Sequence, residues 1–240
     1  MPEEFGFSNN VRIWSIARGS GLPVLLCNGG PGSADYLSPV SDMIDDLAHV
    51  IRFEQRGCGR SEHKPPYDLG TCFQDLEAIR QHYGIQKWVV GGHSWGANLA
   101  LAYALVHRDR AMGLVYLAGN GAQHDIDWRA IYKKGLEEKG EILPDPARFG
   151  NEEVNKQGNI SWYDFIKNPM LLKRISELRI PALFVHGQLD IRPGWPAEQI
   201  ANLMPNARFE TIEAEHYLWL SRPEDLKSIL REFIISLNWG

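Results

Sequence analysis

The sequence predicts an α/β fold with a mostly parallel central sheet flanked by helices. Short β-branched and apolar runs recur along the 240 residues. Most of these runs are continuous, as expected of strands that are buried on both faces of a sheet. Helical patterns separate the runs, and this alternation of strand and helix is typical of a parallel sheet with crossover helices.

The expected elements follow this alternation from the N-terminus to the C-terminus. The segment 11–16 alternates polar and apolar residues and is expected to be an antiparallel edge strand. The continuous runs predict buried strands at 24–27, 50–53, 88–91, 114–117, 182–185 and 208–212. Helices are expected at 37–47, 71–83, 98–106, 195–204 and 223–237.

The alternation stops once, between residues 121 and 175. This segment has no evident buried strand and is rich in aromatic residues, among them Trp128, Phe149 and Trp162. A segment this rich in aromatic residues is expected to pack against another surface of the protein. This favours a small helical cap insertion over a linker. We therefore expect one core, built from residues 1–120 and 176–240, with 121–175 inserted into it.

Composition excludes several classes of function. The net charge is −5 and no basic block is present, which argues against a nucleic-acid partner. No apolar run reaches the 18–20 or so residues of a membrane span, and the first residues do not resemble a signal peptide. The three cysteines form no C-x-x-C pair and the histidines show no H-x-x-x-H spacing, so no metal is expected. We expect a cytoplasmic protein.

A sharp turn that carries a serine follows the expected strand 88–91. Residues 91–96 read Gly-Gly-His-Ser-Trp-Gly and contain G-x-S-x-G with Ser94 at its centre. Such a strand-to-helix turn raises the serine hydroxyl above the sheet edge, and glycine is needed where a Cβ would clash. The N–H of Trp95 would lie at a helix N-terminus, free to stabilise an oxyanion. These features predict Ser94 as a nucleophile rather than a plain N-cap.

A serine nucleophile needs a base and an acid to orient that base. Asp190 stands at the end of the expected strand 182–185, and His216 follows the last expected strand, so the chain order is Ser, Asp, His. Asp125 and Asp127 are rivals for the acid because they also follow a strand. His93 and His186 are near strand ends too, but both are expected to pack. We therefore predict Ser94, Asp190 and His216 as the catalytic residues.

A glycine-rich loop ends the expected strand 24–27. Residues 28–32 read Asn-Gly-Gly-Pro-Gly, which permits close approach of the backbone to a substrate. This is the place for the second oxyanion donor. We assign that donor to Gly30, with Gly29 as the rival and as a candidate substrate contact. A phosphate loop is excluded because no G-K-[ST] follows.

The segment 54–61 reads Glu-Gln-Arg-Gly-Cys-Gly-Arg-Ser and follows the next strand. Two arginines around two glycines indicate a tight loop that charge-assisted hydrogen bonds fix. Arg56 is expected to hold neighbouring loops together rather than to contact substrate.

Together these three motifs resemble the proline iminopeptidase branch of the α/β-hydrolases. That family is marked by H-G-G-P-G, D-Q-R-G-x-G-x-S and a G-x-S-[WY]-G elbow, and residues 56–61 match the second motif outright. The resemblance covers residues 10–120 and 176–240. It implies an α/β-hydrolase fold, a triad of Ser94, Asp190 and His216, and an oxyanion hole of Gly30 and Trp95.

The chain departs from the family pattern in three places. Asn28 replaces the usual His, Glu54 replaces the usual Asp, and the insertion is short. In the family, acidic residues in and near the cap bind the free amino group of the substrate. Here 121–175 holds nine acidic and nine basic residues, so it carries no net negative charge. The candidate carboxylates are Glu137, Glu138 and Glu141, although charged residues on a helix are usually a solvated face.

The expected function is that of a serine hydrolase that works through an acyl-enzyme without a cofactor. The leading hypothesis is proline iminopeptidase-like release of N-terminal residues from short peptides. The alternative is a carboxylesterase or lactonase for small acyl substrates, and a third hypothesis is a non-catalytic ligand receptor on the same fold. A small molecule or a short peptide is the expected partner. The tryptophans that either line the acyl pocket or pack are Trp128, Trp162, Trp195 and Trp219.

Overall fold

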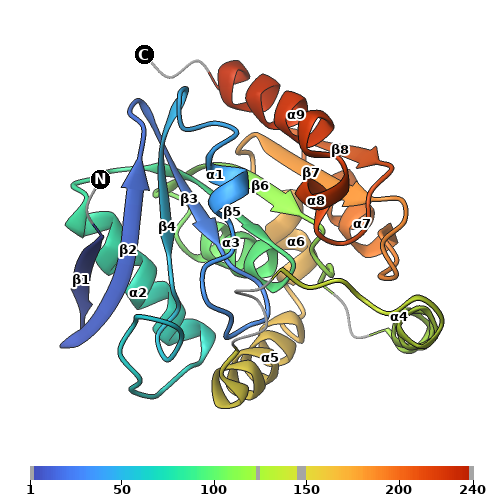
Figure 1. Cartoon of the computed structure of the whole chain (residues 1–240), viewed down its shortest axis with the longest axis horizontal. Helices are drawn as coiled ribbons and strands as arrows, with labels where there is room; N and C mark the ends of the chain where they lie inside the picture. Colours follow the sequence, from blue (N-terminus) through green and yellow to red (C-terminus); the bar gives the residue numbers. More distant parts are fainter. Residues whose placement is uncertain (1–2, 123–124, 145–149, 238–240) are drawn as a thin grey trace.

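A computed structural model describes residues 3–122, 125–144 and 150–237. Its centre is an eight-stranded sheet of order β1-β2-β4-β3-β5-β6-β7-β8 (Figure 1). The β1–β2 and β2–β4 pairs are antiparallel, and every later neighbour pair is parallel. The strands are β1 Glu4–Ser8, β2 Val11–Arg18, β3 Leu22–Cys27, β4 Ala48–Phe53, β5 Trp88–His93, β6 Ala111–Leu117, β7 Ala182–Gly187 and β8 Ala207–Ile212.

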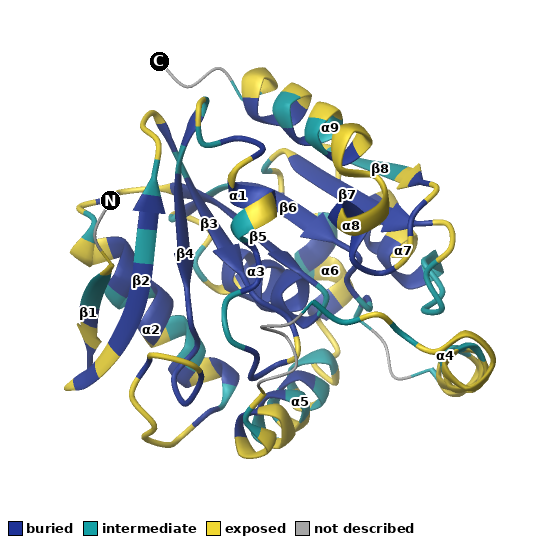
Figure 2. Cartoon of the chain, viewed as in Figure 1, coloured by how far each residue is buried: buried dark blue, intermediate teal, exposed yellow. Residues whose placement is uncertain are grey.

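Helices cover both faces of this sheet, as Figures 1 and 2 show. One face lies under α1 Ser38–Ser41, α8 Leu218–Ser221 and α9 Pro223–Ser236, and the other under α2 Leu69–His82, α3 Trp95–Val106, α6 Leu171–Ser176 and α7 Trp195–Leu203. Successive side chains of a strand point to opposite faces. Leu25 and Val90 accordingly pack with the second group, whereas Leu26 and Val89 pack with the first. Continuous apolar strands were expected for this reason.

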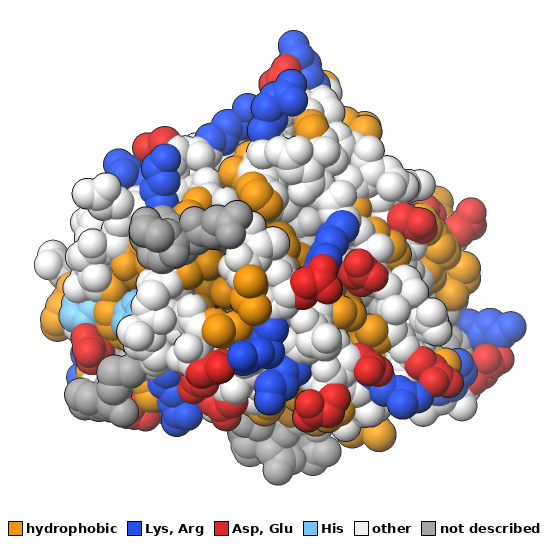
Figure 3. Space-filling view, turned by 90° about the horizontal axis from the view of Figure 1, so that it is seen from above, with side chains coloured by type: hydrophobic (Ala, Val, Ile, Leu, Met, Phe, Trp, Pro, Cys, Tyr) orange, Lys and Arg blue, Asp and Glu red, His pale blue; other side chains and the backbone are white. Residues whose placement is uncertain are grey.

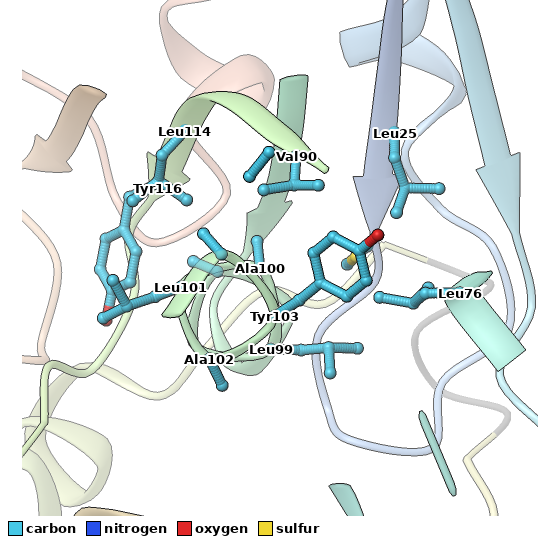
Figure 4. Packing of buried hydrophobic residues seen from close by; sticks show 14 of the residues in the cluster. Leu25, Leu76, Val90, Leu99, Ala100, Leu101, Ala102, Tyr103, Leu114 and Tyr116 are labelled. Carbon is cyan, nitrogen blue, oxygen red and sulfur yellow. The ribbon is translucent and has the colours of Figure 1, made fainter. Parts of the chain in front are cut away.

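The helix that follows the serine turn is the most deeply enclosed. Every residue of α3 from Trp95 to Leu105 is buried. In Figure 4, Leu101 lies beside Tyr116 of β6 on one side of the helix, and Tyr103 faces Leu76 of α2 on the other. This packing fixes the start of α3, and with it the turn that carries Ser94.

The parallel strands and most helices were predicted correctly, but two expectations were wrong in detail and one strand was not predicted. Segment 11–16 is not an edge strand, because β2 pairs with β1 on one side and with β4 on the other. Strand β1 itself was not predicted. The helix expected at 37–47 ends at Ser41, and the chain then continues through tight turns such as Met43 N–H to Val40 O and Ile44 N–H to Ser41 O.

The insertion contains α4 Ile126–Lys139, α5 Glu152–Ile166 and α6. No strand occurs in its described residues, in agreement with the sequence. Helix α4 has no buried residue and stands away from the sheet, whereas α5 buries Val154, Gly158 and Trp162. Phe149 lies outside the described residues. The unit boundaries 1–120, 121–175 and 176–240 stay a prediction.

The surface carries both signs of charge. Figure 3 shows Lys and Arg side chains beside Asp and Glu side chains along the lower part of one face, with hydrophobic side chains between them. Such a mixed pattern agrees with the small net charge of −5. In the parts of the chain that are described, no helix is long and apolar enough to cross a bilayer.

Candidate active site

The structure places Ser94 between β5 and α3, at the carboxyl edge of the parallel strands. Its backbone has φ of 58° and ψ of −123°, a conformation that few non-glycine residues adopt. Its N–H donates to Leu117 O at 2.8 Å, which ties the turn to the end of β6. The strained turn is thus held by the sheet, as a nucleophile elbow requires.

Two glycines make this turn possible, as predicted. A Cβ on Gly96 would lie 2.1 Å from Cys27 O, and one on Gly92 would lie 2.3 Å from the carbonyl carbon of Gly96. Both distances are far shorter than a carbon can approach. The glycine loop runs equally close to the serine, because a Cβ on Gly29 would lie 2.9 Å from Ser94 Cβ.

The structure also brings Asp190 and His216 together. His216 Nδ1 and Asp190 Oδ2 are 2.6 Å apart. The loop after β7 holds the acid, because Asp190 Oδ1 accepts the N–H of Arg192 at 2.9 Å. A carboxylate can only accept, so Nδ1 carries the proton and Nε2 is left with a lone pair.

Ser94 and His216 line one pocket of about 410 Å³. Within the described residues no hydrogen bond joins Ser94 Oγ to His216. Such contacts are often loose until a substrate is bound. The site therefore holds a paired acid and base with the serine in the same pocket.

Burial and neighbouring charges shift the pKa values of this pair. The pKa of His216 is lowered, first by burial and then by the cation of Arg192, although Asp190 opposes both. Burial alone would raise the pKa of Asp190, but His216 and Arg192 hold it below its ordinary value. At neutral pH the imidazole is neutral and the carboxylate is charged, as a general base and its orienting acid must be.

The oxyanion donors can be compared from their hydrogen bonds. The N–H of Gly29 donates to Tyr36 Oη at 2.7 Å, so it is occupied. The N–H groups of Gly30 and Trp95 have no partner among the described residues. Gly30 also lines the Ser94 pocket. This geometry favours Gly30 over Gly29 as the donor, with Trp95 N–H at the first turn of α3.

The rival residues have other roles. Asp125 caps α4 by accepting the N–H groups of Asp127 and Trp128. His186 Nε2 bonds to Arg192 O at 2.9 Å. His93 lies in a buried network behind the site. It is Asp190, and not one of these rivals, that accepts the hydrogen bond from His216 Nδ1.

The three carboxylates expected in the cap differ in their surroundings. Glu137 and Glu138 form exposed contacts with Lys133 and Lys134 on α4, at 3.9 and 3.8 Å. Glu141 alone of the three lines the Ser94 pocket. There its carboxylate accepts two hydrogen bonds from the guanidinium of Arg192, at 2.7 and 2.9 Å.

Sequence reasoning missed several residues of this pocket, and three of them have polar groups that bear on its chemistry. Arg192 lies on the ring of Tyr132 and links the insertion to the acid loop through Glu141. Glu152, in the first turn of α5, also lines the pocket, and its exposed carboxylate has no hydrogen-bond partner among the described residues. Tyr36 is the third. Only Arg192 had a signal in the sequence, because it stands two residues after Asp190.

The arginine loop has the structural role that was expected. Arg56 donates two hydrogen bonds to Asp75 of α2, at 3.0 and 2.6 Å, and another to Ser8 O of β1. Glu54 accepts from Asp35 N–H and from Arg60. Asn28, which departs from the family motif, bonds to Phe53 O and accepts from Tyr36 N–H. These contacts fix the loops around the glycine segment.

The four candidate tryptophans pack in the core or lie on or beside α4. Trp162 and Trp219 are buried in the two core clusters. Trp128 Nε1 donates to Pro193 O at 3.0 Å, and Trp195 lines a separate hollow beside α4. The described lining of the Ser94 pocket includes none of them.

Comparisons with known proteins agree with this architecture. The family model for the alpha/beta hydrolase fold matches residues 23–142, which is half of the chain. A putative proline iminopeptidase of Mycoplasma pneumoniae is 34% identical over 126 residues, covering 51% of this chain and 40% of the relative. The first curated relatives are thus matched over less than half of their length.

Two further matches span nearly the whole chain. A proline iminopeptidase of Clostridioides difficile is 22% identical over 284 residues, with 95% of both chains covered. Among solved structures, a thermophilic esterase from Thermogutta terrifontis superposes with a TM-score of 0.80 at 22% identity, covering 99% of both chains. With the family model and the observed sheet order, these matches show that the chain belongs to the alpha/beta hydrolase fold family.

Proposed function

We propose that the protein is a serine hydrolase that works through an acyl-enzyme. One observation carries the proposal. Ser94, His216 and Gly30 line the same pocket, while Asp190 lies 2.6 Å from the far nitrogen of that histidine. Nucleophile, base, acid and oxyanion donor are the parts that acyl transfer needs.

Each residue has a defined role in the proposed reaction. Ser94 Oγ attacks the substrate carbonyl while His216 Nε2 accepts its proton. The N–H groups of Gly30 and Trp95 stabilise the oxyanion that forms. His216 then gives its proton to the leaving group, which departs and leaves an acyl-serine. Water that His216 activates hydrolyses this ester, and Asp190 stabilises the imidazolium in both halves.

For the substrate, we propose release of an N-terminal residue from short peptides. The names of the relatives support this class, since they are proline iminopeptidases. The exposed carboxylate of Glu152 lines the Ser94 pocket and has no hydrogen-bond partner among the described residues. It also supports this class, because it offers a counter-charge to a free α-amino group. In this proposal residues 121–175 form a cap over the core residues 1–120 and 176–240.

One observation favours a second candidate, hydrolysis of small esters or lactones. The carboxylate of Glu141, which lines the pocket, accepts two hydrogen bonds from Arg192, and this cation neutralises its charge. A carboxylate paired in this way attracts an ammonium group weakly. The esterase from Thermogutta terrifontis, which shares the fold, belongs to this class by its title.

Covalent labelling tests the mechanism. A fluorophosphonate probe should label the wild-type protein at Ser94, and Ser94→Ala should abolish the labelling. Ser33→Ala is the matched control, because Ser33 lines the same pocket and should leave labelling intact. Labelling that persists in Ser94→Ala would mean that another residue is the nucleophile. A folded wild-type protein that is never labelled would instead favour a non-catalytic receptor.

Turnover of two model substrates separates the candidate classes. The peptidase proposal expects hydrolysis of proline β-naphthylamide, and Glu152→Gln should raise its KM while KM for p-nitrophenyl acetate stays the same. Hydrolysis of p-nitrophenyl acetate and short lactones alone would favour the second candidate.

A further inference from the structure

A buried histidine that the proposed reaction does not use lies at the meeting point of three loops. His93 is fully buried and directly precedes Ser94. Its Nδ1 lies 2.8 Å from Tyr36 Oη, and its Nε2 lies 3.0 Å from the carbonyl oxygen of His216. Tyr36 Oη is in turn 2.7 Å from the N–H of Gly29. One side chain therefore connects the serine turn, the glycine loop and the histidine loop.

These side chains and backbone groups form a hydrogen-bonded chain. The groups at its two ends fix the direction of every hydrogen bond in it. The carbonyl of His216 can only accept, so His93 Nε2 must carry the proton. The Nδ1 of a neutral imidazole with that tautomer is an acceptor, and the hydroxyl of Tyr36 donates to it. The remaining lone pairs of that hydroxyl accept the N–H of Gly29. The chain is thus Gly29 N–H to Tyr36 O–H to His93 to His216 C=O, with each donor and acceptor used.

We infer that His93 and Tyr36 are positioning residues that hold the oxyanion loop and the histidine loop in register with Ser94. The inference rests on the proposed function, because it assigns these residues a role in that reaction. Tyr36 binds the N–H of Gly29 and so fixes the position of the neighbouring N–H of Gly30. His93 binds the backbone of His216 and so fixes the position of the imidazole relative to Ser94. An error of a few tenths of an ångström at either place weakens transition-state stabilisation.

The rings around the chain leave it little freedom. Tyr36 stacks on Trp219 at 6.0 Å between centroids, and Tyr217 lies 5.0 Å from His93. The pKa of His93 is lowered well below its ordinary value by burial and next by the neighbouring His216, which keeps the ring neutral. Protonation of Nδ1 would turn that acceptor into a donor and break the chain at Tyr36.

Tyr36→Phe tests the inference because it removes one hydroxyl from the middle of the chain. We expect kcat for p-nitrophenyl acetate, and the rate of fluorophosphonate labelling, to fall about tenfold while KM changes less than about twofold. The matched control is Tyr103→Phe. Tyr103 is also buried and bonds to two partners, Trp88 and Glu77, but it lies away from the site. This control should lose stability without loss of kcat.

Substitution of His93 provides a second test if Tyr36→Phe folds poorly. His93→Gln keeps one donor and one acceptor, so it should retain most of the labelling rate, whereas His93→Leu keeps neither and should lose it. Equal rates in His93→Gln and His93→Leu would overturn the inference. So would a Tyr36→Phe protein that is labelled as fast as the wild type.

A spectroscopic measurement tests the chain without any substrate. Nitrogen chemical shifts of His93 in the wild-type protein should show a neutral ring protonated at Nε2 between pH 6 and 8. An Nδ1–H tautomer would contradict the derived directions and overturn the inference. A wild-type protein that is folded but unlabelled at Ser94 would instead overturn the proposed function, so the two failures are distinguishable.

Discussion

At the scale of single residues, the site depends on the short hydrogen bond between His216 Nδ1 and Asp190 Oδ2, at 2.6 Å. Because the carboxylate fixes the proton on Nδ1, Asp190→Asn should favour the wrong tautomer and remove the partner of the imidazolium. We expect kcat to fall by about 10⁴-fold with little change in KM. Steady-state kinetics with the better of the two model substrates would measure this.

The control for this prediction is Asp125→Asn, the rival acid. Its side chain caps α4 by accepting two N–H groups, and asparagine is nearly as good a cap. We expect near-normal kcat and a loss of less than about 1 kcal/mol in stability. The assignment of the acid would be wrong if Asp125→Asn, and not Asp190→Asn, abolished turnover.

Residues whose role is set by local backbone geometry were predictable from the sequence. Ser94 and Gly30 stand in short motifs, and the chain order of serine, acid and histidine after expected strands indicated Asp190 and His216. Glu152, which enters the pocket from α5, had no signal in the sequence, and Arg192 had only its place two residues after Asp190. Their contacts depend on how the insertion lies on the core, which a motif does not encode.

At the scale of elements, the approach of α3 to the end of β3 depends on one missing side chain. Gly96→Ala would place a Cβ 2.1 Å from Cys27 O. Without a clash, alanine in a helix should be more stable than glycine by about 1 kcal/mol. A lower stability of the variant would therefore be due to the clash. We expect a protein with a much lower Tm, or none that folds. Gly6→Ala is the control, since a Cβ there has ordinary contact with His82 at 3.6 Å. Equal Tm values for the two variants would contradict the observed packing.

The arginine loop is joined to α2 by a buried ion pair between Arg56 and Asp75. Arg56→Met would leave the Asp75 carboxylate buried without its partner, which typically costs about 3–5 kcal/mol. The double variant Arg56→Met/Asp75→Leu removes both charges and should recover most of that loss. Chemical denaturation of the three proteins would measure the difference. A double variant no more stable than the single one would contradict the assignment of the loss to the unpaired charge of Asp75.

Elements with strong patterns were predicted, and those with weak patterns were not. The buried parallel strands are continuous apolar runs, so their positions could be read directly. Strand β1 has only five residues, one of which is Gly6, and it depends on pairing with β2. Helix α1 begins at Ser38 and stops after four residues, although the apolar pattern continues to Leu47. Tertiary contacts decide such cases, and local propensity does not.

At the scale of the whole molecule, folding buries two neutral histidines, His216 in the Ser94 pocket and His93 behind it. The folded protein lowers the pKa of His93 and of His216, by burial first in both cases. In the unfolded chain both groups return to about 6.5. Below that pH the unfolded chain binds protons that the folded protein does not, so unfolding becomes easier. Above it both forms are neutral and the two histidines contribute no pH dependence.

This difference predicts that the free energy of unfolding falls as the pH drops from 6.5 to 5.5. The slope that each histidine adds stays below about 1.4 kcal/mol per pH unit. Chemical denaturation at steps of about 0.25 pH units would measure this slope. The range from pH 6.5 to 5.5 lies above the ordinary pKa values of carboxylates. His93→Gln removes one of the two groups and should make the slope smaller. Stability that stays constant or rises across this window would mean that the two rings take up protons in the folded protein, and the hydrogen-bond chain through Tyr36 could not then have the direction derived for it.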